Sequence, residues 1–436
     1  MRQPNISVVV LNTNNRRYLE DCFTSLSRQD YPADRFELVL ADNASTDGSV
    51  EFVRERFPRV RIIAFDRNHG FSIANNLAAA QVEGEFVAFL NEDTRVEPHW
   101  LSGLVEALGD EPEVICAGSK MLSWDGQRID FGGTLLSFLG HGRADGFNDP
   151  DLTAYDRYRY ILAACGGAML IDRRVFLEVG GFDEDFKAYF EDIDLGWRLW
   201  ILGHKVVFAP QSICYHIHFG SSSKQPTSRV QYLYERNALY TIIKNFEPRY
   251  LERVLPLALL MQSKRAYLWG QMAGVDMDEC RYNLARSLPA ARPAGPYNAA
   301  YYWREAWHTL RADGLPGLAR KVVDEWDRRR GRPVPALPGQ PDLREQPNFW
   351  IEQACLAATN DVIENMATMM QKRAAIQGGR RRSDREIFKT VRALSFDICF
   401  DTPEYQRAQQ RLIELFAIPE LFGDIYDAQI PFALRM

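Results

Sequence analysis

Short, largely apolar runs alternate with longer stretches of mixed polarity in the first part of the chain. Each run is too apolar to lie at a surface, so it predicts a strand inside a sheet. The predicted strands are Ile6–Leu11, Leu38–Ala41, Val60–Phe65, Phe86–Leu90 and Val114–Ala117. Between them, apolar residues recur every three or four positions, which predicts helices around residues 19–26, 50–57 and 101–108. This alternation predicts an α/β fold with a mostly parallel sheet and helices on both of its faces.

Polar clusters follow the first four predicted strands, at the point where each strand ends. The clusters contain Asn12 and Thr13, Asp42 and Asn43, Arg67 and Asn68, and Asn91, Glu92 and Asp93. In open α/β sheets the carboxyl ends of the strands meet at one edge, and ligands bind there. Amides and carboxylates at that edge can hydrogen-bond a base and a ribose, and Asp93 can hold a divalent cation on phosphate oxygens. Together the clusters predict a nucleoside diphosphate site, although turn chemistry alone would explain any single one.

A second acidic segment opens a helix that the sequence predicts from about Glu191 to Leu202, with Gly203 as its C-terminal cap. Acids in a first helical turn face the positive end of the helix dipole, which also favours their ionised form. Glu191, Asp192 and Asp194 are more acids than capping requires. We therefore predict a general base here, because a carboxylate aimed at a sugar hydroxyl can take its proton as the hydroxyl attacks.

Two histidines, His216 and His218, follow a predicted strand at Lys205–Phe208. In an extended chain they point the same way, but two side chains cannot complete a metal site. One interpretation is a structural, hydrogen-bonded role for each. The other is that one of them joins Asp93 at a shared cation, since oxygen and imidazole ligands together suit Mn²⁺ or Mg²⁺.

The remaining segments carry weaker patterns. Residues 120–160 are rich in glycine and aromatic residues, which predicts a mobile excursion over the sheet edge. Helical periodicity recurs at residues 229–246, 316–330, 351–372 and 406–416. Residues 332–347 are rich in proline and predict a linker.

Composition excludes several classes of protein. The 436 residues are 46% hydrophobic and 25% charged, which is typical of a globular chain of two or three domains. A formal net charge of -6 gives no indication of nucleic acid as a partner. The seven cysteines are scattered, which favours reduced thiols over a disulfide framework. We find no signal peptide and no apolar run long enough to span a membrane, so we expect a cytoplasmic protein.

An ordered series of motifs resembles family 2 glycosyltransferases over roughly the first half of the chain. The loop with Asp125-Gly126 and Gly132-Gly133 is most similar to the rhamnosyltransferase-like branch. The motifs are Ile6–Asn14, Asp42–Gly48, Asn68–Asn75 and Asn91–Asp93 in the nucleotide half, and Gly166–Ala168, Gly180–Glu184, Glu191–Asp194 and Arg198 in the acceptor half.

The resemblance implies a GT-A fold and an inverting, metal-dependent transfer of a hexose-type sugar from a UDP- or dTDP-sugar. It implies that Asp192 is the base with Glu191 beside it, and that Asp93 binds Mn²⁺ or Mg²⁺ with His216 or His218 as a further ligand. The implied acceptor is a hydroxyl of a glycan or of a lipid-linked molecule, in polysaccharide biosynthesis. The nucleotide-binding residues that we predict are Asn12, Thr13, Asp42, Asn43, Asn68, Gly70, Asn75 and Asn91.

We predict four segments: a catalytic domain at 1–224, a helical region at 225–331 that packs on it, a linker at 332–347 and a helical region at 348–436. A peripheral contact with the inner face of a membrane and the oligomeric state stay open. Two other functions also stay open, a sugar nucleotidyltransferase and a catalytically silent carbohydrate-binding or scaffold protein. A nucleotidyltransferase is expected to carry a glycine-rich, basic phosphate loop soon after the first strand, and Asn12–Arg17 lacks the glycines. A silent protein is expected to have lost Asp93 or Asp192, and both are present.

Overall fold

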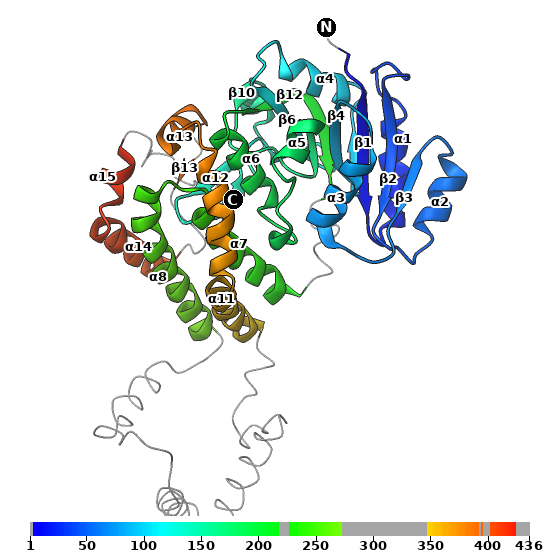
Figure 1. Cartoon of the computed structure of the whole chain (residues 1–436). Helices are drawn as coiled ribbons and strands as arrows, with labels where there is room; N and C mark the ends of the chain where they lie inside the picture. The colour runs from blue at the N-terminus through cyan, green and yellow to red at the C-terminus, as the bar shows by residue number, and fades with distance from the viewer. Residues whose placement is uncertain (1–2, 218–225, 273–346, 392–393, 396–401, 424–436) are drawn as a thin grey trace, which may run out of the picture. The chain divides into compact units, whose positions relative to one another are not determined.

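The computed structural model describes residues 3–217, 226–272, 347–391, 394–395 and 402–423 (Figure 1). Contacts divide the chain into two compact units, one formed by residues 1–266 with 353–436 and the other by residues 267–352. The sheet and the candidate site belong to the first unit. The predicted helix at 316–330, the linker residues 332–346 and His218 lie outside the described residues.

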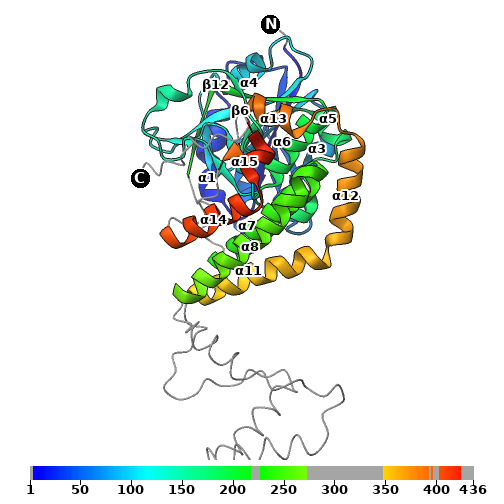
Figure 2. The same ribbon diagram turned by 90° about the vertical axis from the view of Figure 1, so that its left-hand side faces the viewer.

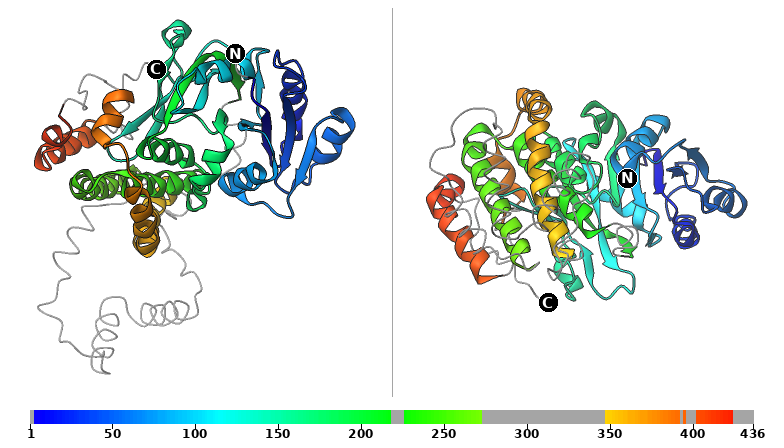
Figure 3. Two further views of the ribbon diagram at one scale, coloured as in Figure 1. Left: turned by 45° about the horizontal axis from the view of Figure 1, so that its top comes forward. Right: turned by 90° about the horizontal axis from the view of Figure 1, so that it is seen from below.

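The predicted α/β sheet is present. Its main path has the strand order β10-β12-β6-β11-β4-β1-β2-β3, and β1 to β3 form one end of it (Figure 3). The first four predicted strands are confirmed and pair in parallel, with Asn12 opposite Asp42 and Leu11 opposite Asn91. Their polar clusters therefore lie at one edge, as expected. The strand bounds are β1 Ile6–Asn12, β2 Phe36–Asp42, β3 Arg61–Ala64, β4 Phe86–Asn91, β5 Thr94–Val96, β6 Val114–Ser123, β11 Ala168–Asp172 and β12 Lys205–His216.

The middle of the sheet is mixed rather than parallel. Strand β11 runs antiparallel to both of its neighbours, β4 and β6. The antiparallel ladder aligns Ala168 with Leu90, so the chain just before β11 returns to the edge where β4 ends. Gly167 accepts a hydrogen bond from the backbone N–H of Asn91 at 2.9 Å. The segment that leads into β11 is thus hydrogen-bonded directly to the predicted site.

Strand β12 is much longer than the predicted Lys205–Phe208. Its pairing with β6 jumps from Ala209 opposite Ser119 to Ile213 opposite Lys120, which is a bulge that bends and twists the strand. Beyond the bulge, β12 also pairs with β5, with His216 opposite Thr94. This pairing brings the end of β12 next to Asp93, whose carbonyl accepts the N–H of Ile217 at 3.0 Å.

The glycine-rich excursion is more regular than the sequence predicts. It forms short strands and one 3-10 turn instead of an irregular loop. Glycine is required at Gly140, where φ is +94° and a Cβ would lie 2.2 Å from the carbonyl oxygen of Ala238. The excursion is therefore packed closely on helix α7, Thr227–Asn245. Its elements are β7 Ile129–Phe131, β8 Thr134–Ser137, β9 Gly142–Ala144, η1 Leu152–Tyr155 and β10 Arg159–Tyr160; β13 Leu394–Ser395 pairs with β8.

Helices flank the sheet with the apolar faces that their periodicity predicts. Helix α1 buries Leu19, Cys22, Phe23 and Leu26, which belong to the main hydrophobic core. Cys22, Cys116 and Cys214 are buried free thiols, as expected for this composition. The helix bounds here are α1 Arg16–Leu26, α2 Ser49–Arg56, α3 Gly70–Gln81, α4 Trp100–Leu108, α5 Arg173–Glu178, η2 Glu184–Phe186 and α6 Glu191–Ile201.

The C-terminal part is helical, and α7 packs on α6 and α12 (Figure 2). The predicted helix at 351–372 is divided at Asn365 into two helices, and the predicted helix at 406–416 begins earlier, at Pro403. The sequence prediction missed α8, because Pro256 lies inside it. None of the described helices is both long and apolar enough to cross a membrane. The bounds are α7 Thr227–Asn245, α8 Pro248–Met272, α11 Pro347–Glu364, α12 Met366–Gly378, α13 Asp384–Val391, α14 Pro403–Leu415 and α15 Ile418–Phe422.

Candidate active site

A cavity of about 500 Å³ lies where β4, β11, α6 and β12 converge. Five of the predicted site residues line it: Asn91, Asp93, Glu191, Asp192 and His216. The sequence separates the two acidic segments by about a hundred residues, and the fold brings them to one space. Its other walls are mostly aromatic residues and glycines, among them Phe71, Phe131, Gly166, Gly167, Tyr189, Phe190 and Tyr234.

Asp93 and His216 form a carboxylate-imidazole pair on one side of the cavity. Their side chains approach to 3.4 Å between Oδ1 and Nε2, and the β5–β12 pairing fixes this approach. The other ring nitrogen, Nδ1, lies 2.8 Å from Oδ2 of Asp130, a residue of β7 that is 8% exposed. A second carboxylate behind a histidine fixes the orientation of the ring and raises its basicity. Sequence reasoning missed Asp130, because a three-residue strand shows no periodic pattern.

The two carboxylates determine the protonation of His216. Burial alone would lower the pKa of this imidazole, but its contacts with Asp130 and Asp93 raise the pKa to about 10. The two carboxylates thus favour the protonated form of the imidazole. A metal ion that took Nε2 would displace this proton, so metal binding and proton release are coupled here.

Asp192 lies across the cavity at the start of α6. Its Oδ2 accepts the backbone N–H of Gly166 at 3.0 Å and its Oδ1 accepts that of Ile193 at 2.8 Å. Burial raises the pKa of Asp192, and these amides lower it by a smaller amount. The sequence prediction that the helix terminus keeps this carboxylate a weaker base is thus wrong in its net direction, because removal from water outweighs the helix amides.

Glu191 is the more enclosed of the two neighbouring acids, at 6% exposure. Burial raises its pKa well above the ordinary glutamate value, and the adjacent charge of Asp192 raises it further. Its Oε2 is buried and has no hydrogen-bond partner among the described residues, and the residue as a whole lines the cavity. An enclosed carboxyl of this kind is suited to receive a hydrogen bond from, or donate one to, a bound hydroxyl.

The predicted nucleotide residues on β1 and β2 lie at the same edge but outside this cavity. Asn12 is fully buried and donates from Nδ2 to Asp42 at 3.0 Å and to Ser45 at 2.9 Å. The other Asp42 oxygen accepts the N–H of Ser45 at 2.9 Å. These bonds fix the loop after β2, as the turn interpretation predicts. Thr13 is half-buried in the bend after β1.

The next cluster follows the same pattern. Asn43 donates to Asn68 at 3.0 Å and accepts the N–H of His69 at 2.8 Å, so it joins two loops. Asn68 also accepts the N–H of Gly70, which opens α3 with φ +77°. Asn75 is buried and donates to the carbonyl of Phe71 within α3. Contact of these residues with a nucleotide remains a prediction.

Two family models match the part of the chain that forms this site. Residues 7–177 match the model of glycosyl transferase family 2, and residues 128–241 match that of glycosyltransferase-like family 2. Together the two matches extend over residues 7–241, which is more than half of the chain. The chain belongs to glycosyltransferase family 2.

Relatives of this family 2 glycosyltransferase agree with that placement. The chain is 31% identical to the uncharacterized protein y4gI of Sinorhizobium fredii over 54% of its length, and 31% identical to the O-antigen biosynthesis protein RfbC of Myxococcus xanthus over 51%. These matches span only 27% and 18% of the two relatives. It is 29% identical to the N-acetylglucosaminyl-diphospho-decaprenol L-rhamnosyltransferase of Mycobacterium tuberculosis, over 44% of this chain and 70% of that one.

A solved structure of GalNAc-T7 with UDP, GalNAc and Mn²⁺ overlaps the chain with a TM-score of 0.48 at 16% identity. The overlap covers 77% of this chain and 59% of that one. Likeness at this level carries no conclusion about the substrate of the glycosyltransferase described here.

A buried ion network anchors helix α6 of the glycosyltransferase. Lys244 of α7 is 1% exposed and pairs with Asp183 and, at 2.8 Å, with Asp194. The other oxygen of Asp194 accepts Nε of Arg198 at 2.8 Å. Burial opposes ionisation of Asp183, but Lys244 and Lys372 outweigh it and hold the pKa of that carboxyl well below its usual range.

We expect Lys244→Met to lower the free energy of unfolding by about 3 kcal/mol, because it removes the cation that two buried carboxylates share and leaves only Arg198 beside Asp194 and Lys372 beside Asp183. The depressed pKa of Asp183 means that its contribution is complete above the unfolded value of about 3.9 and is lost as pH falls below it. Urea unfolding at pH 7 and at about pH 3 should therefore show a smaller difference between variant and wild type at the lower pH.

Lys264→Met is the matched control, because Lys264 pairs with the half-exposed Glu404. That change should cost about 1 kcal/mol or less at both pH values. Equal urea midpoints for the two lysine variants would contradict the anchoring role of Lys244.

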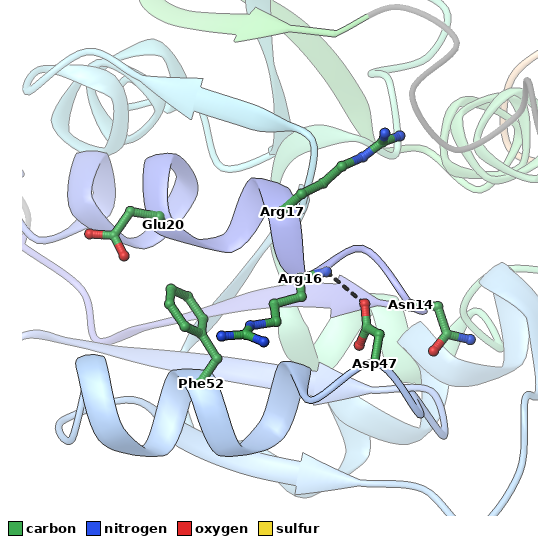
Figure 4. A pocket seen from close by; sticks show the side chains of 6 residues that line it. All are labelled: Asn14, Arg16, Arg17, Glu20, Asp47 and Phe52. Carbon is green, nitrogen blue, oxygen red and sulfur yellow. Dashed lines mark hydrogen bonds between the residues drawn. The ribbon is translucent and has the colours of Figure 1, made fainter.

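A second pocket of about 560 Å³ lies between the starts of α1 and α2 (Figure 4). The Arg16 side chain extends toward Phe52, with its Cζ 5.2 Å from the ring centroid, and the Arg16 backbone N–H donates to Asp47 at 2.9 Å. Arg17 points away from both. None of the predicted site residues lines this pocket, so it is separate from the acidic cavity.

Proposed function

We propose that this glycosyltransferase moves a hexose-type sugar from a UDP- or dTDP-sugar to a hydroxyl of a glycan or lipid-linked acceptor, with inversion at the anomeric carbon. The observation that carries the proposal is the shared cavity, which the Asp93–His216 pair and the Glu191–Asp192 pair face from different elements. Family membership favours sugar transfer over nucleotidyl transfer. The M. tuberculosis relative, whose name gives a diphospho-lipid acceptor, supports a lipid-linked acceptor here.

The charge of the cavity supports a divalent cation. Its lining holds the acids Asp93, Glu191 and Asp192 beside the basic groups Arg143 and His216, so the side chains offer a diphosphate little excess positive charge. A diphosphate adds further negative charge, so its binding requires neutralisation. No cluster of three or more His, Cys, Asp or Glu ligands occurs in the described ranges, so the diphosphate and water have to complete the coordination.

Asp93 and His216 are the residues that would hold the cation. A carboxylate oxygen and an imidazole nitrogen are a donor set suited to Mn²⁺ or Mg²⁺. When bound, the ion supplies Lewis-acid stabilisation of the negative charge that develops on the departing phosphate oxygen.

The protein residues account for the rest of the reaction. Asp192 is the base that takes the proton of the acceptor hydroxyl, and its burial-raised pKa makes it a stronger base than an exposed aspartate. The acceptor oxygen forms a bond to the anomeric carbon as the bond from that carbon to the phosphate oxygen breaks. Glu191, which lines the cavity beside Asp192, helps to position the acceptor hydroxyl.

Thermal-shift measurements with UDP, dTDP and GDP, with and without Mn²⁺, test the donor side. A ligand that binds only the folded state raises its apparent stability by about 2.7 kcal/mol at 100 times its Kd. We expect UDP or dTDP to raise the melting temperature, and to do so only with Mn²⁺. No shift with any of the three, or equal shifts without the metal, would contradict the proposed cation-dependent site.

A further inference from the structure

The backbone just before the acid pair is strained at three non-glycine positions. Lys187, Tyr189 and Phe190 have φ values of 64°, 67° and 67°. The N–H of Ala188 donates to the carbonyl of Phe186 at 2.7 Å, which closes a γ-turn centred on Lys187. L residues rarely adopt these conformations, and they persist only where the surrounding structure enforces them. We call residues 186–190 the acceptor turn.

One buried side chain hydrogen-bonds to most of the carbonyl groups of the acceptor turn. Nδ2 of Asn237, on α7, lies 3.1, 2.8 and 2.7 Å from the carbonyl oxygens of Phe186, Ala188 and Tyr189. Asn237 is fully buried. These oxygens flank the strained positions, so the amide stabilises the conformation that the local sequence disfavours.

Arg236 fixes the orientation of that amide. Its Nη2 donates to Oδ1 of Asn237 at 2.9 Å and to the carbonyl of Asp185 at 2.7 Å. Because guanidinium groups only donate, this contact identifies the asparagine oxygen and directs its NH₂ group toward the turn. Arg236 is 3% exposed, so the pair forms a buried support behind the acceptor turn.

The acceptor turn leads directly into the proposed catalytic acids. The carbonyl of Phe190 accepts the N–H of Asp194, so the last strained residue begins α6. Tyr189 and Phe190 line the cavity, and both rings pack on Tyr234 with centroids 5.0 Å apart. A change in the turn would therefore displace Asp192 and this aromatic wall together.

We propose that Asn237, supported by Arg236, is a positioning residue for the acceptor side of the reaction, acting on Asp192 through the acceptor turn. This rests on the proposed role of Asp192 as base. The hydrogen bonds from Asn237 to the acceptor turn do not reach the Asp93–His216 pair, in which Asp93 lies between β4 and β5 and His216 ends β12. Removing it should consequently affect catalysis and leave the donor site intact.

Asn237→Asp and Asn237→Ala test the proposal. The aspartate keeps the shape but replaces the donor with an oxygen that repels the carbonyls, and the alanine removes the group. We expect kcat to fall about 10- to 100-fold, as displacement of a catalytic group by about 1 Å does. The dissociation constant for UDP with Mn²⁺ should stay within about twofold of wild type. The assay measures release of UDP or dTDP from UDP-glucose and dTDP-rhamnose, with water as acceptor.

Lys187 offers two further variants, because its side chain is exposed and does not line the cavity. Proline cannot adopt a positive φ, so Lys187→Pro should reproduce the loss in kcat with normal donor affinity. Glycine adopts it freely, so Lys187→Gly added to Asn237→Ala should restore kcat at least about threefold.

Thr241→Val is the matched control. Thr241 is fully buried one turn further along α7, and its hydroxyl donates to the Asn237 carbonyl without reaching the turn. We expect wild-type kcat and donor affinity from it. A kcat per folded molecule within twofold of wild type in Asn237→Asp and in Lys187→Pro would overturn the proposal. Parallel losses of kcat and donor affinity would overturn it too, since they indicate a general structural role.

Failure of the proposed base is a separate result. If Asp192→Asn keeps normal turnover, the base assignment is wrong, whatever the Asn237 variants do. If Asp192→Asn is inactive while Asn237→Asp and Lys187→Pro are normal, the base stands and the positioning role is lost.

Discussion

Asp192→Asn should bind the nucleoside diphosphate as wild type does and transfer sugar about 100-fold or more slowly, the lower end expected for loss of a general base. The amide has nearly the same shape as the carboxylate, although its NH₂ group cannot accept, so one of the backbone N–H groups of Gly166 and Ile193 loses its acceptor. The amide also cannot accept the proton of the acceptor hydroxyl. Donor affinity and turnover are measured on one sample of the variant.

Two further acids serve as comparisons for that variant. Glu184→Gln removes the same charge at an exposed position of η2 that does not line the cavity, and it should leave turnover unchanged. Glu191→Gln should lower turnover by less than Asp192→Asn, because the amide still hydrogen-bonds the acceptor. A larger loss in Glu191→Gln would transfer the role of base to Glu191. Near-normal turnover in Asp192→Asn would remove that residue from the chemistry.

The pH dependence of turnover tests the same assignment. A base acts only when ionised, and burial raises the pKa of Asp192 above the ordinary aspartate value of about 3.9. Turnover by wild type should therefore fall with decreasing pH at values above 4. The residual turnover of Asp192→Asn should lack this acidic limb.

The second large effect is expected at the cation. Asp93→Asn should abolish the metal-dependent part of nucleotide binding and leave the fold intact. Asp93 is the carboxylate beside His216 in the cavity, so the variant keeps one neutral oxygen where the ion needs an anionic ligand. Binding of UDP or dTDP is measured by calorimetry with and without Mn²⁺.

Glu92→Gln is the neighbouring control, because Glu92 is also buried but contacts Asn15 and does not line the cavity. It should keep metal-dependent binding. Unchanged Mn²⁺-dependent affinity in Asp93→Asn would show that Asp93 does not hold the ion. A fall in melting temperature as large as that of Lys244→Met would show that its main role is in folding.

Features that depend on short stretches of chain could be predicted from sequence. The run Phe86–Leu90 is apolar throughout because the strand is buried on both faces, and the acids after it reach the sheet edge for that reason. Helix α6 begins and ends within a residue of its predicted bounds, and Gly203, with φ +97°, follows it as the predicted cap. The roles predicted for the individual site residues came from the family motifs.

Features that depend on contacts between distant segments could not be predicted from the sequence. Asp130 and His216 are 86 residues apart, and no local pattern relates them. Asn237 occurs in a correctly predicted helix, but its partners lie in a turn about 50 residues earlier, and their positive φ values have no glycine to signal them. The net pKa of Asp192 depends on burial, which the sequence of the helix start does not reveal.

The bulge in β12 determines on which side of the strand His216 lies. Between Ala209 and Ile213 the strand contains three residues that have no counterpart on β6, and one of them, Ser212, is fully buried against Ser119 and Trp100. Side chains alternate between the two faces of a strand, so the parity of this surplus sets the face of every later residue. Deleting one residue at 210–212 would turn His216 away from Asp93. The number of residues in this bulge, which does not line the cavity, thus determines whether His216 can take part in the candidate cation site.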